Sequence, residues 1–274
     1  PVPPAPPPAP PAPPPPPPPP PPAPPVPPVP APPPTPPAPA PAPPPPPAPP
    51  PPPPALPGTV QTAAPGASGF DTDTALDESS ASAFVADGFQ FAIRYLTRDA
   101  AESGSDLTSQ EATEILSAGL ALMAVQHVAA SGWVPSAELG TEQGQWAARN
   151  AASVGFPPDV TIWLDLEGVA SGTSSSDVLA YCAAWYAAVL AAGYAPGLYV
   201  GANCGLSADE ISATPFEYFW QSGSSVPVPE QGYCLIQTIG GATLSGVSYD
   251  SDLVPEDGPT PPNWLAPLPQ DSAN

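Results

Sequence analysis

Short apolar runs alternate with helical patterns over most of the chain beyond residue 58. Eight of these runs are four to eight residues long and bounded by turn formers, as strands are. They cover residues 69–72, 89–95, 120–127, 160–167, 197–200, 218–221, 234–238 and 248–253. Strand, helix and strand in repeated order predict an α/β fold with a parallel sheet, and eight strands are the number that closes a (β/α)8 TIM-type barrel.

The helical segments carry start and stop signals. LTSQEATEILSAG has Thr108 as an N-cap with a glutamate three residues later, which predicts a capping box, and it ends at Gly119. GTEQGQWAARNAASVG ends at Gly155, and the amphipathic, Ala-rich SSSDVLAYCAAWYAAVLAAG ends at Gly193. The units after Tyr199 are shorter and poorer in helix, so we expect the last third of the barrel to be irregular.

The first 58 residues are mostly proline and contain no charged residue. Consecutive prolines fix φ and remove amide donors, so polyproline II is the conformation that remains. We therefore predict a rod or spacer over residues 1–58, a linker over 59–68 and the barrel over 69–274.

Three roles stay open for the proline tract. A spacer is the simplest. A ligand for SH3-type domains usually has a basic flank beside its PxxP core, and the tract has none. The third role is a glycan-bearing rod that assembles into a fibre. Because Thr35 is the only hydroxyl residue in the tract, the sugars would sit on hydroxylated prolines, in a composition similar to that of hydroxyproline-rich wall glycoproteins.

The chain is strongly acidic, with 25 Asp and Glu against three Lys and Arg and a net charge of −22. It has no lysine, and Arg94, Arg98 and Arg149 are its only fixed cations. A nucleic-acid partner requires basic contacts, so we exclude that class. An acidic surface suits high salt, an acidic medium or an extracellular setting, and drift of a solvated surface is the alternative.

No apolar run reaches the roughly 18 residues of a membrane helix, so we expect no membrane span. The chain begins at Pro1 without methionine, which we interpret as a processed or truncated start from which a secretion signal could have been lost. We expect an extracellular or cell-surface protein. Three cysteines, Cys182, Cys204 and Cys234, allow at most one internal disulfide, and we expect three buried free thiols.

The stretch VTIWLDLEG ends a predicted strand with two carboxylates. Side chains two apart in a strand point to the same side, so Trp163, Asp165 and Glu167 should share one face. Two carboxylates on one face repel each other, so something should compensate for them.

Functional residues of a barrel sit at the carboxyl ends of its strands. The polar residues at or near the predicted ends are Asp71, His127, Asp165, Glu167, Gln221, Gln237, Asp250 and Asp252. The first and last strands of a closed barrel are neighbours, so Asp71 should approach Asp250 and Asp252, with the fourth strand facing them across the mouth. We predict an acidic pocket for a polar, uncharged ligand.

Other residues near this pocket have a structural alternative to a functional role. Trp163, Trp220 and Tyr199 are candidates for stacking on sugar rings, although aromatic residues on strands more often pack in a core. His127, the sole histidine, we interpret as a packed or hydrogen-bonded residue of the rim rather than a catalyst. An oxygen-rich pocket suits calcium or magnesium, but no EF-hand spacing is present, and we expect no metal and no cofactor.

The order GFDT, FAIRYLT, LTSQEATEILSAGLAL, WLDLEG, GLYVG, FWQS, IQT and YDSDL resembles the glycoside-hydrolase-like DUF1906 family of secreted actinobacterial and phage proteins, itself similar to family 25 lysozymes. The resemblance spans residues 69–253. It implies a barrel with a carboxylate-lined pocket at its top.

The lysozyme pattern implies roles for particular residues. It matches Asp71, Asp165 and Glu167, with Glu167 as the proton donor, and Asp250 or Asp252 on the last strand. The last-strand motif is Asp-Ser-Asp here, where lysozymes usually have Asp-x-Asn. Two hypotheses follow. In one, the barrel is a structural, glycan-associated module carried on a proline rod. In the other, it is an enzyme that cleaves cell-wall amino-sugar polymers.

Overall fold

A computed structural model describes residues 55–99 and 105–269. Its centre is a closed barrel of eight strands, in which β4 pairs with β5 and β9 pairs with β2 to complete the ring. The strands are β2 (Ser68–Thr72), β3 (Phe91–Leu96), β4 (Ala121–Gln126), β5 (Thr161–Leu166), β6 (Ala195–Val200), β7 (Tyr218–Gln221), β8 (Leu235–Leu244) and β9 (Val247–Leu253). All eight predicted strands are present, and the predicted fold class is confirmed.

One strand runs against the expected direction. Strands β2 to β8 are parallel, whereas β9 is antiparallel to both β8 and β2. The expectation of an all-parallel barrel was therefore wrong at β9. The cause is the turn at Ser245 and Gly246, which have φ of 50° and 84° and form a two-residue hairpin connection. Parallel neighbours need a crossover of a dozen or so residues, and no such length separates β8 from β9.

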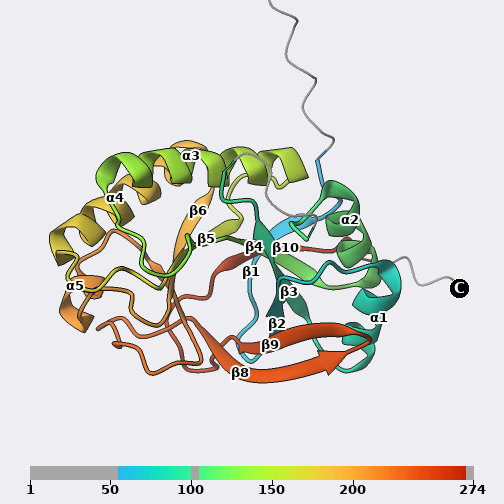
Figure 1. Cartoon of the computed structure of the whole chain (residues 1–274). Helices are drawn as coiled ribbons and strands as arrows, with labels where there is room; N and C mark the ends of the chain where they lie inside the picture. The colour runs from blue at the N-terminus through green and yellow to red at the C-terminus, as the bar shows by residue number, and fades with distance from the viewer. Residues whose placement is uncertain (1–54, 100–104, 270–274) are drawn as a thin grey trace, which may run out of the picture. The chain divides into compact units, whose positions relative to one another are not determined.

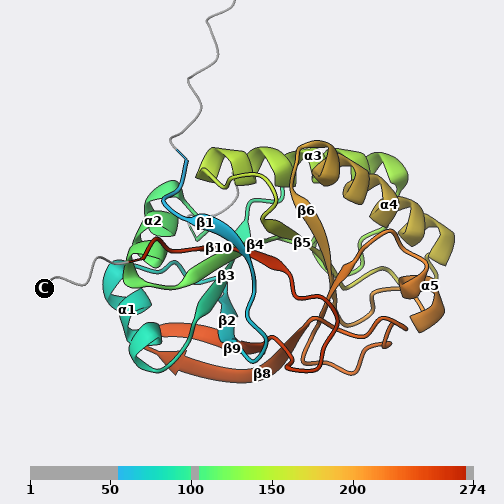
Figure 2. The same ribbon diagram turned by 180° about the vertical axis from the view of Figure 1, so that it is seen from behind.

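Helices pack outside the barrel, as Figures 1 and 2 show. They are α1 (Glu78–Ala86), α2 (Ser109–Ala118), α3 (Ala137–Val154), α4 (Ser175–Ala191) and the short α5 (Ala208–Ser212). The sequence analysis missed α1, and the poverty of helix after β6 is confirmed. Thr108 caps α2 as predicted, but the capping box is not completed, because the Glu111 carboxylate binds Arg94 and the Leu76 backbone N–H instead.

Two apolar layers hold the barrel. The outer layer lies between the strands and the helices, and the inner layer fills the barrel around Phe91, Met123, Trp163 and Trp220. Close packing inside requires small residues opposite large ones. A Cβ atom built on Gly197 would lie 2.4 Å from the Trp163 ring, so glycine on β6 makes room for the indole of β5. The three cysteines are buried and free, as predicted.

A pair of strands missed by the sequence analysis covers the amino ends of the barrel strands. β1 (Thr59–Thr62) pairs antiparallel with β10 (Asn263–Ala266), and β10 joins the sheet through Leu265 opposite Leu122 of β4 (Figure 2). Trp264 of β10 belongs to the inner apolar layer. The segment predicted as a linker, 59–68, thus contains a strand of the sheet.

The predicted rod falls almost entirely on residues 1–54, which lie outside the described residues, and its roles stay predictions. Among the described residues, every helix is too short or too polar to cross a membrane.

Candidate functional site

A cavity of about 500 Å³ opens at the carboxyl ends of β2 to β5. We call it the acidic cavity, because Asp71, Asp73, Asp165, Glu167 and Asp250 line it. Asp71 comes from β2, Asp165 from β5, and Asp250 from β9, where it is paired with Asp71 in register. The structure therefore brings together four of the five carboxylates predicted for the site, and the fifth, Asp252, lies beneath them.

Asp252 and Asp71 form a buried carboxyl pair. Asp252 is 2% exposed and its carboxyl interacts with that of Asp71; its Oδ1 accepts a hydrogen bond of 2.9 Å from the Trp220 Nε1–H, and its Oδ2 receives none from the described residues. Two carboxyls can bond to each other only if one carries a proton. Burial raises the pKa of Asp71 to about 7, and burial followed by the charge of Asp71 raises the pKa of Asp252 well above its ordinary value. The pair therefore holds a proton in mildly acidic solution.

The two carboxyls at the end of β5, Asp165 and Glu167, also have pKa values raised by burial. Asp165 is 4% exposed, and no hydrogen bond from the described residues reaches its Oδ1. Burial, then the charges of Glu167 and Asp71, raise the pKa of Asp165 well above its usual range. Burial alone raises the pKa of Glu167, which is half-buried. Among the described residues no ion pair involves either carboxylate, and their raised pKa values favour the protonated forms instead.

Gln237 of β8 links the carboxyl pair to the opposite wall. Its Oε1 accepts hydrogen bonds from the Tyr199 hydroxyl at 3.0 Å and from the Gly223 N–H at 3.1 Å. Both of these groups are donors, so the amide must direct Nε2 towards Asp71, whose Oδ2 it reaches at 2.7 Å. Gln237 therefore positions Asp71.

The predicted aromatic and amide contacts divide into two groups. Tyr199 is half-buried near the carboxylates, whereas Trp163 and Trp220 are fully buried and pack edge to face at 5.6 Å beneath them. The two indoles form the floor and offer no face to a ligand. Gln221 alternates with the inward-facing Trp220 on β7 and is not among the residues of the acidic cavity.

His127 lines the acidic cavity at its rim. Its Nε2 lies 3.2 Å from Oδ1 of Asp106, and its ring stacks on Tyr95 at 4.5 Å. Asp106 in turn accepts a hydrogen bond from the Thr97 hydroxyl at 2.7 Å. The histidine thus packs on Tyr95 and faces Asp106, and its interpretation as a rim residue stays a prediction.

The sequence analysis missed Tyr95 of β3. This tyrosine lines the acidic cavity, and burial followed by the charges of Asp71 and Asp165 raises the pKa of its hydroxyl well above the usual value. The sequence did contain a signal for it. Phe91, Ile93 and Tyr95 are two residues apart and share one face of β3, and Tyr95 lies near the carboxyl end of the strand.

The described residues include no group of three or more His, Cys, Asp or Glu side chains arranged to hold a metal ion. Gln237 donates to Asp71 and Trp220 donates to Asp252, so these two carboxyls are already engaged by neutral donors.

The closed eight-stranded barrel gathers carboxylates at the carboxyl ends of its parallel strands, where barrel enzymes place their active sites. The sequence profile of the Rv2525c-like, glycoside hydrolase-like domain matches residues 82–241, more than half of the chain. The chain belongs to this family, and the resemblance to DUF1906 is confirmed. Among curated proteins, no relative matches the chain.

Solved structures share the fold. The Tat-secreted protein Rv2525c of Mycobacterium tuberculosis, in complex with L-tartrate, has a TM-score of 0.55 and 19% identity over 71% of this chain and 98% of its own. A lysozyme of Streptomyces coelicolor has a TM-score of 0.51 and 19% identity over 71% of this chain and 93% of its own. The autolysin LytC of Streptococcus pneumoniae, in complex with a synthetic peptidoglycan ligand, has a TM-score of 0.51 and 9% identity over 73% of this chain and 47% of its own. At these identities the likeness concerns the fold.

Proposed function

We propose that this chain is a glycoside hydrolase that cleaves β-linked amino-sugar polymers, with Glu167 as the proton donor. One observation carries the proposal: Asp71, Asp165, Glu167 and Asp250, far apart in the sequence, line a single cavity. The family and the lysozyme and autolysin among the structures of similar fold support it.

The resting site suits acid catalysis. Burial raises the pKa of Glu167, which favours the protonated carboxyl that can transfer its proton to the glycosidic oxygen as the bond to the sugar C1 breaks. Positive charge then develops at C1, and an ionised carboxyl beside C1 stabilises this charge; a neighbouring carboxyl that starts protonated first gives its proton to water in the open cavity.

Asp165 and Asp71 are the candidates for the second role. Either carboxylate can stabilise the oxocarbenium-like centre, orient the substrate's acetamido group or take the proton of the attacking water. The developing cation therefore supplies the opposite charge that the cluster of acids lacks in the free protein.

The test is Glu167→Gln, which preserves size and removes the transferable proton. We expect the release of reducing ends from purified peptidoglycan or chitin to fall by about 100- to 10,000-fold, because that is the usual contribution of a general acid. Glu114→Gln on α2, away from the acidic cavity, is the matched control. Unfolding curves of both variants must overlay that of the unsubstituted protein, and equal hydrolysis by Glu167→Gln and Glu114→Gln would refute the assignment.

The charge of the chain favours a second candidate, an extracellular glycan-associated structural protein. Bacterial walls are anionic, and a net charge of −22 opposes binding to them. In this alternative, the barrel binds glycans without cleaving them, and the proline tract carries sugars on hydroxylated prolines within a fibre. Mass spectrometry of residues 1–58 together with the assembly state tests it: unmodified proline masses and a monomer would count against it.

A further inference from the structure

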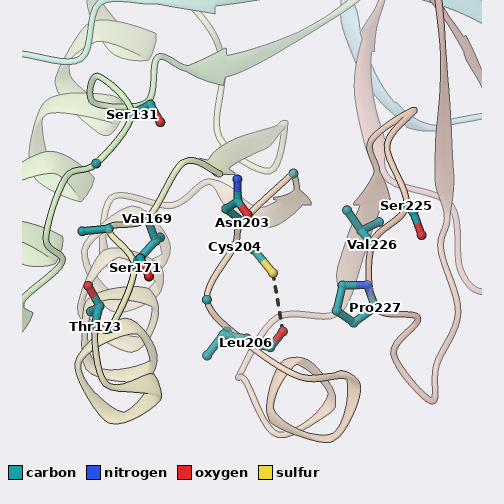
Figure 3. Close-up of a pocket in the computed structure, with 15 residues that line it drawn as sticks. Ser131, Val169, Ser171, Thr173, Asn203, Cys204, Leu206, Ser225, Val226 and Pro227 are labelled. Atoms are coloured by element: carbon teal, nitrogen blue, oxygen red, sulfur yellow. Dashed lines mark hydrogen bonds between the residues drawn. The ribbon is translucent and has the colours of Figure 1, made fainter.

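A second cavity, of about 610 Å³, lies on the rim of the barrel next to the acidic one. Its walls are the loops that follow β4, β5, β6 and β7, and Figure 3 shows their side chains around Asn203. Ser131, Ser171, Thr173 and Ser225 supply hydroxyls and Asn203 supplies an amide, beside small apolar side chains. None of its lining residues is charged or aromatic, so we call it the neutral cavity.

Glu167 lies at the boundary of the two cavities. It lines the acidic cavity, and Gly201, at the end of β6, lines the neutral one. A Cβ atom built on Gly201 would lie 2.5 Å from Cβ and 2.7 Å from Oε2 of Glu167, so the glutamate side chain packs directly on the backbone of the neutral cavity. Glu167 therefore contacts residues of both cavities.

Backbone hydrogen bonds fix the walls of the neutral cavity. The Gly132 N–H donates to the Gly168 carbonyl at 2.7 Å, and the Gly168 N–H donates to the Ala202 carbonyl at 2.9 Å. The Val169 N–H donates to the Asn203 carbonyl at 3.0 Å. The loops thus continue the sheet beyond the barrel, which forms the cavity before a ligand arrives and lowers the ordering cost of binding.

Asn203 is the polar side chain best placed to recognise a ligand. Its φ of 56° lies in the left-handed region, which asparagine tolerates better than most residues. The residue is exposed, and its side-chain amide makes no hydrogen bond within the described part of the chain. One face of the cavity therefore presents both a donor and an acceptor that are free to bind.

We propose that the neutral cavity binds one uncharged sugar unit of a saccharide chain whose neighbouring unit occupies the acidic cavity, so that the glycosidic bond between them crosses Glu167. The inference rests on the proposed function and names its substrate class, a glycan of uncharged units with hydroxyl and acetamido groups. Hydroxyls and an amide match such groups, and a ligand carboxylate would meet no cation in the neutral cavity and five carboxylates in the acidic one.

The experiment measures the binding of a β-1,4-linked N-acetylglucosamine hexamer to the full chain carrying Glu167→Gln, by titration calorimetry. Adding Asn203→Gly removes the amide while retaining a residue that adopts positive φ. Adding Ser225→Trp instead fills the neutral cavity from an exposed position. We expect either substitution to weaken hexamer binding about tenfold, the usual effect of losing one well-made polar contact.

Ser82→Trp on the exposed face of α1 is the matched control and should leave hexamer affinity unchanged. If the hexamer binds and neither neutral-cavity substitution weakens it, the inference is overturned, while hydrolysis by the unsubstituted protein would still support the proposed function. If the substitutions weaken binding and the unsubstituted protein hydrolyses nothing, the neutral cavity stands as a glycan site and the catalytic proposal falls. Absence of hexamer binding overturns the inference.

A galacturonic acid hexamer tests the charge of the substrate. We expect it to bind at least tenfold more weakly than the uncharged hexamer at low salt, with the difference shrinking as salt screens the carboxylates. Equal affinity of the two hexamers at low salt would overturn the assignment to uncharged glycans.

Discussion

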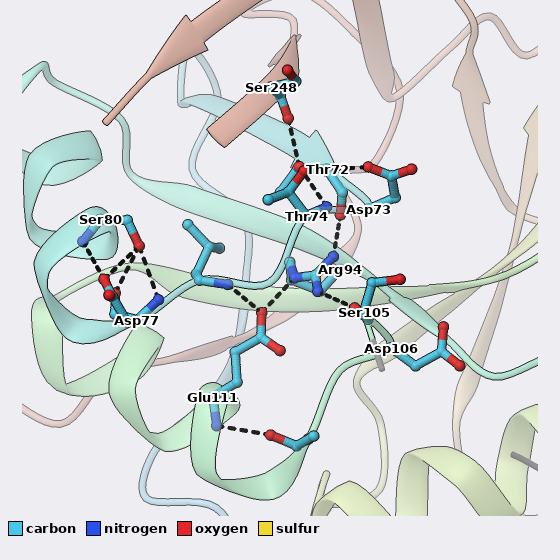
Figure 4. Close-up of polar contacts among 12 residues, drawn as sticks. Thr72, Asp73, Thr74, Asp77, Ser80, Arg94, Ser105, Asp106, Glu111 and Ser248 are labelled. Atoms are coloured by element: carbon cyan, nitrogen blue, oxygen red, sulfur yellow. Dashed lines mark hydrogen bonds and ion pairs between the residues drawn. The ribbon is translucent and has the colours of Figure 1, made fainter. Parts of the chain in front are cut away.

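Buried charged side chains have different partners on the two faces of the barrel wall. On the outer face of β3, the fully buried Arg94 donates from Nε to Glu111 at 2.6 Å, from Nη2 to the Ser105 carbonyl at 2.6 Å and from Nη1 to the Thr72 carbonyl (Figure 4). On the inner face, Asp71, Asp165 and Asp252 are almost as buried and rely on protons and neutral donors.

The difference corresponds to two roles, support of the fold by the outer ion pair and the proposed catalysis by the inner acids. A buried ion pair with satisfied hydrogen bonds holds one conformation, and here it fixes the backbone of Thr72 directly beside Asp71. A cluster of unpaired acids costs stability and is retained where a ligand or a reaction uses it.

The largest effect should come from breaking the outer network. Arg94→Met leaves the buried Glu111 carboxylate without its cation, and we expect the free energy of unfolding to fall by about 3–5 kcal/mol in urea titrations. Arg149→Met, at an exposed position where the guanidinium lies over the Trp146 ring at 5.2 Å, should cost under about 1 kcal/mol. Similar losses in the two variants would remove the structural role assigned to Arg94.

Next in size is the pH dependence of stability. A carboxyl whose pKa is raised by folding binds more protons in the folded than in the unfolded state between the two values, so stability falls as pH rises. Because the pKa of Asp71 rises from 3.8 to about 7, we expect a loss on the order of a few kcal/mol between pH 4 and pH 7.

Other carboxyls set the shape of this profile. The pKa values of Asp165 and Asp252 are also raised, which adds to the loss of stability as pH rises. Backbone hydrogen bonds at a helix cap lower the pKa of the exposed Asp77, an effect that acts in the opposite direction at pH below 4. Urea unfolding at intervals from pH 3 to 9 should therefore show maximal stability near pH 4–5, and a maximum at pH 7 or above would contradict the protonated cluster.

A smaller change in stability should come from Asp252→Asn, which replaces an unpaired acid on the inner face with a neutral side chain that can both donate and accept hydrogen bonds. The asparagine can accept from Trp220 and donate to Asp71, so no shared proton is needed. We expect a gain of about 1–2 kcal/mol at pH 8 and little change at pH 4, measured in urea. Asp257→Asn, at an exposed position, is the control. If Asp252→Asn loses stability at pH 8 and Asp257→Asn does not, the need to protonate the Asp71–Asp252 pair is not what destabilises the protein.

The smallest effect should come from the rim. His127→Gln removes the pair with Asp106 at 3.2 Å, where the histidine side chain is 26% exposed, and partly exposed pairs contribute little. We expect a loss under about 1 kcal/mol that shrinks in high salt. A loss approaching that of Arg94→Met would place His127 with the structural network.

The sequence predicts the barrel well because its signals are local. Each strand is a short apolar run, and the convergence of Asp71, Asp165 and Glu167 follows from the geometry of parallel strands that share one rim. The antiparallel direction of β9 could also have been predicted, because the nine residues between the last two predicted strands are too few for a crossover.

Other features depend on contacts that no local pattern reveals. β1 and β10 are four residues each, and they pair across most of the chain. The bonding of Glu111 to Arg94 rather than to its own helix end depends on where β3 lies. The neutral cavity is built from loops whose residues carry no charge or aromatic ring, so composition gives no sign of it.

The hairpin of β8 and β9 has a consequence for how the site assembles. Gln237, Asp250 and Asp252 lie within sixteen residues of one another in sequence and are joined by the two-residue turn, so these three residues at and beneath the acidic cavity belong to one contiguous unit. Hairpins form in about 1–10 μs, much faster than contacts between distant segments. We therefore expect the β8–β9 hairpin to form before β2 pairs with β9 and brings Asp71 to Asp250.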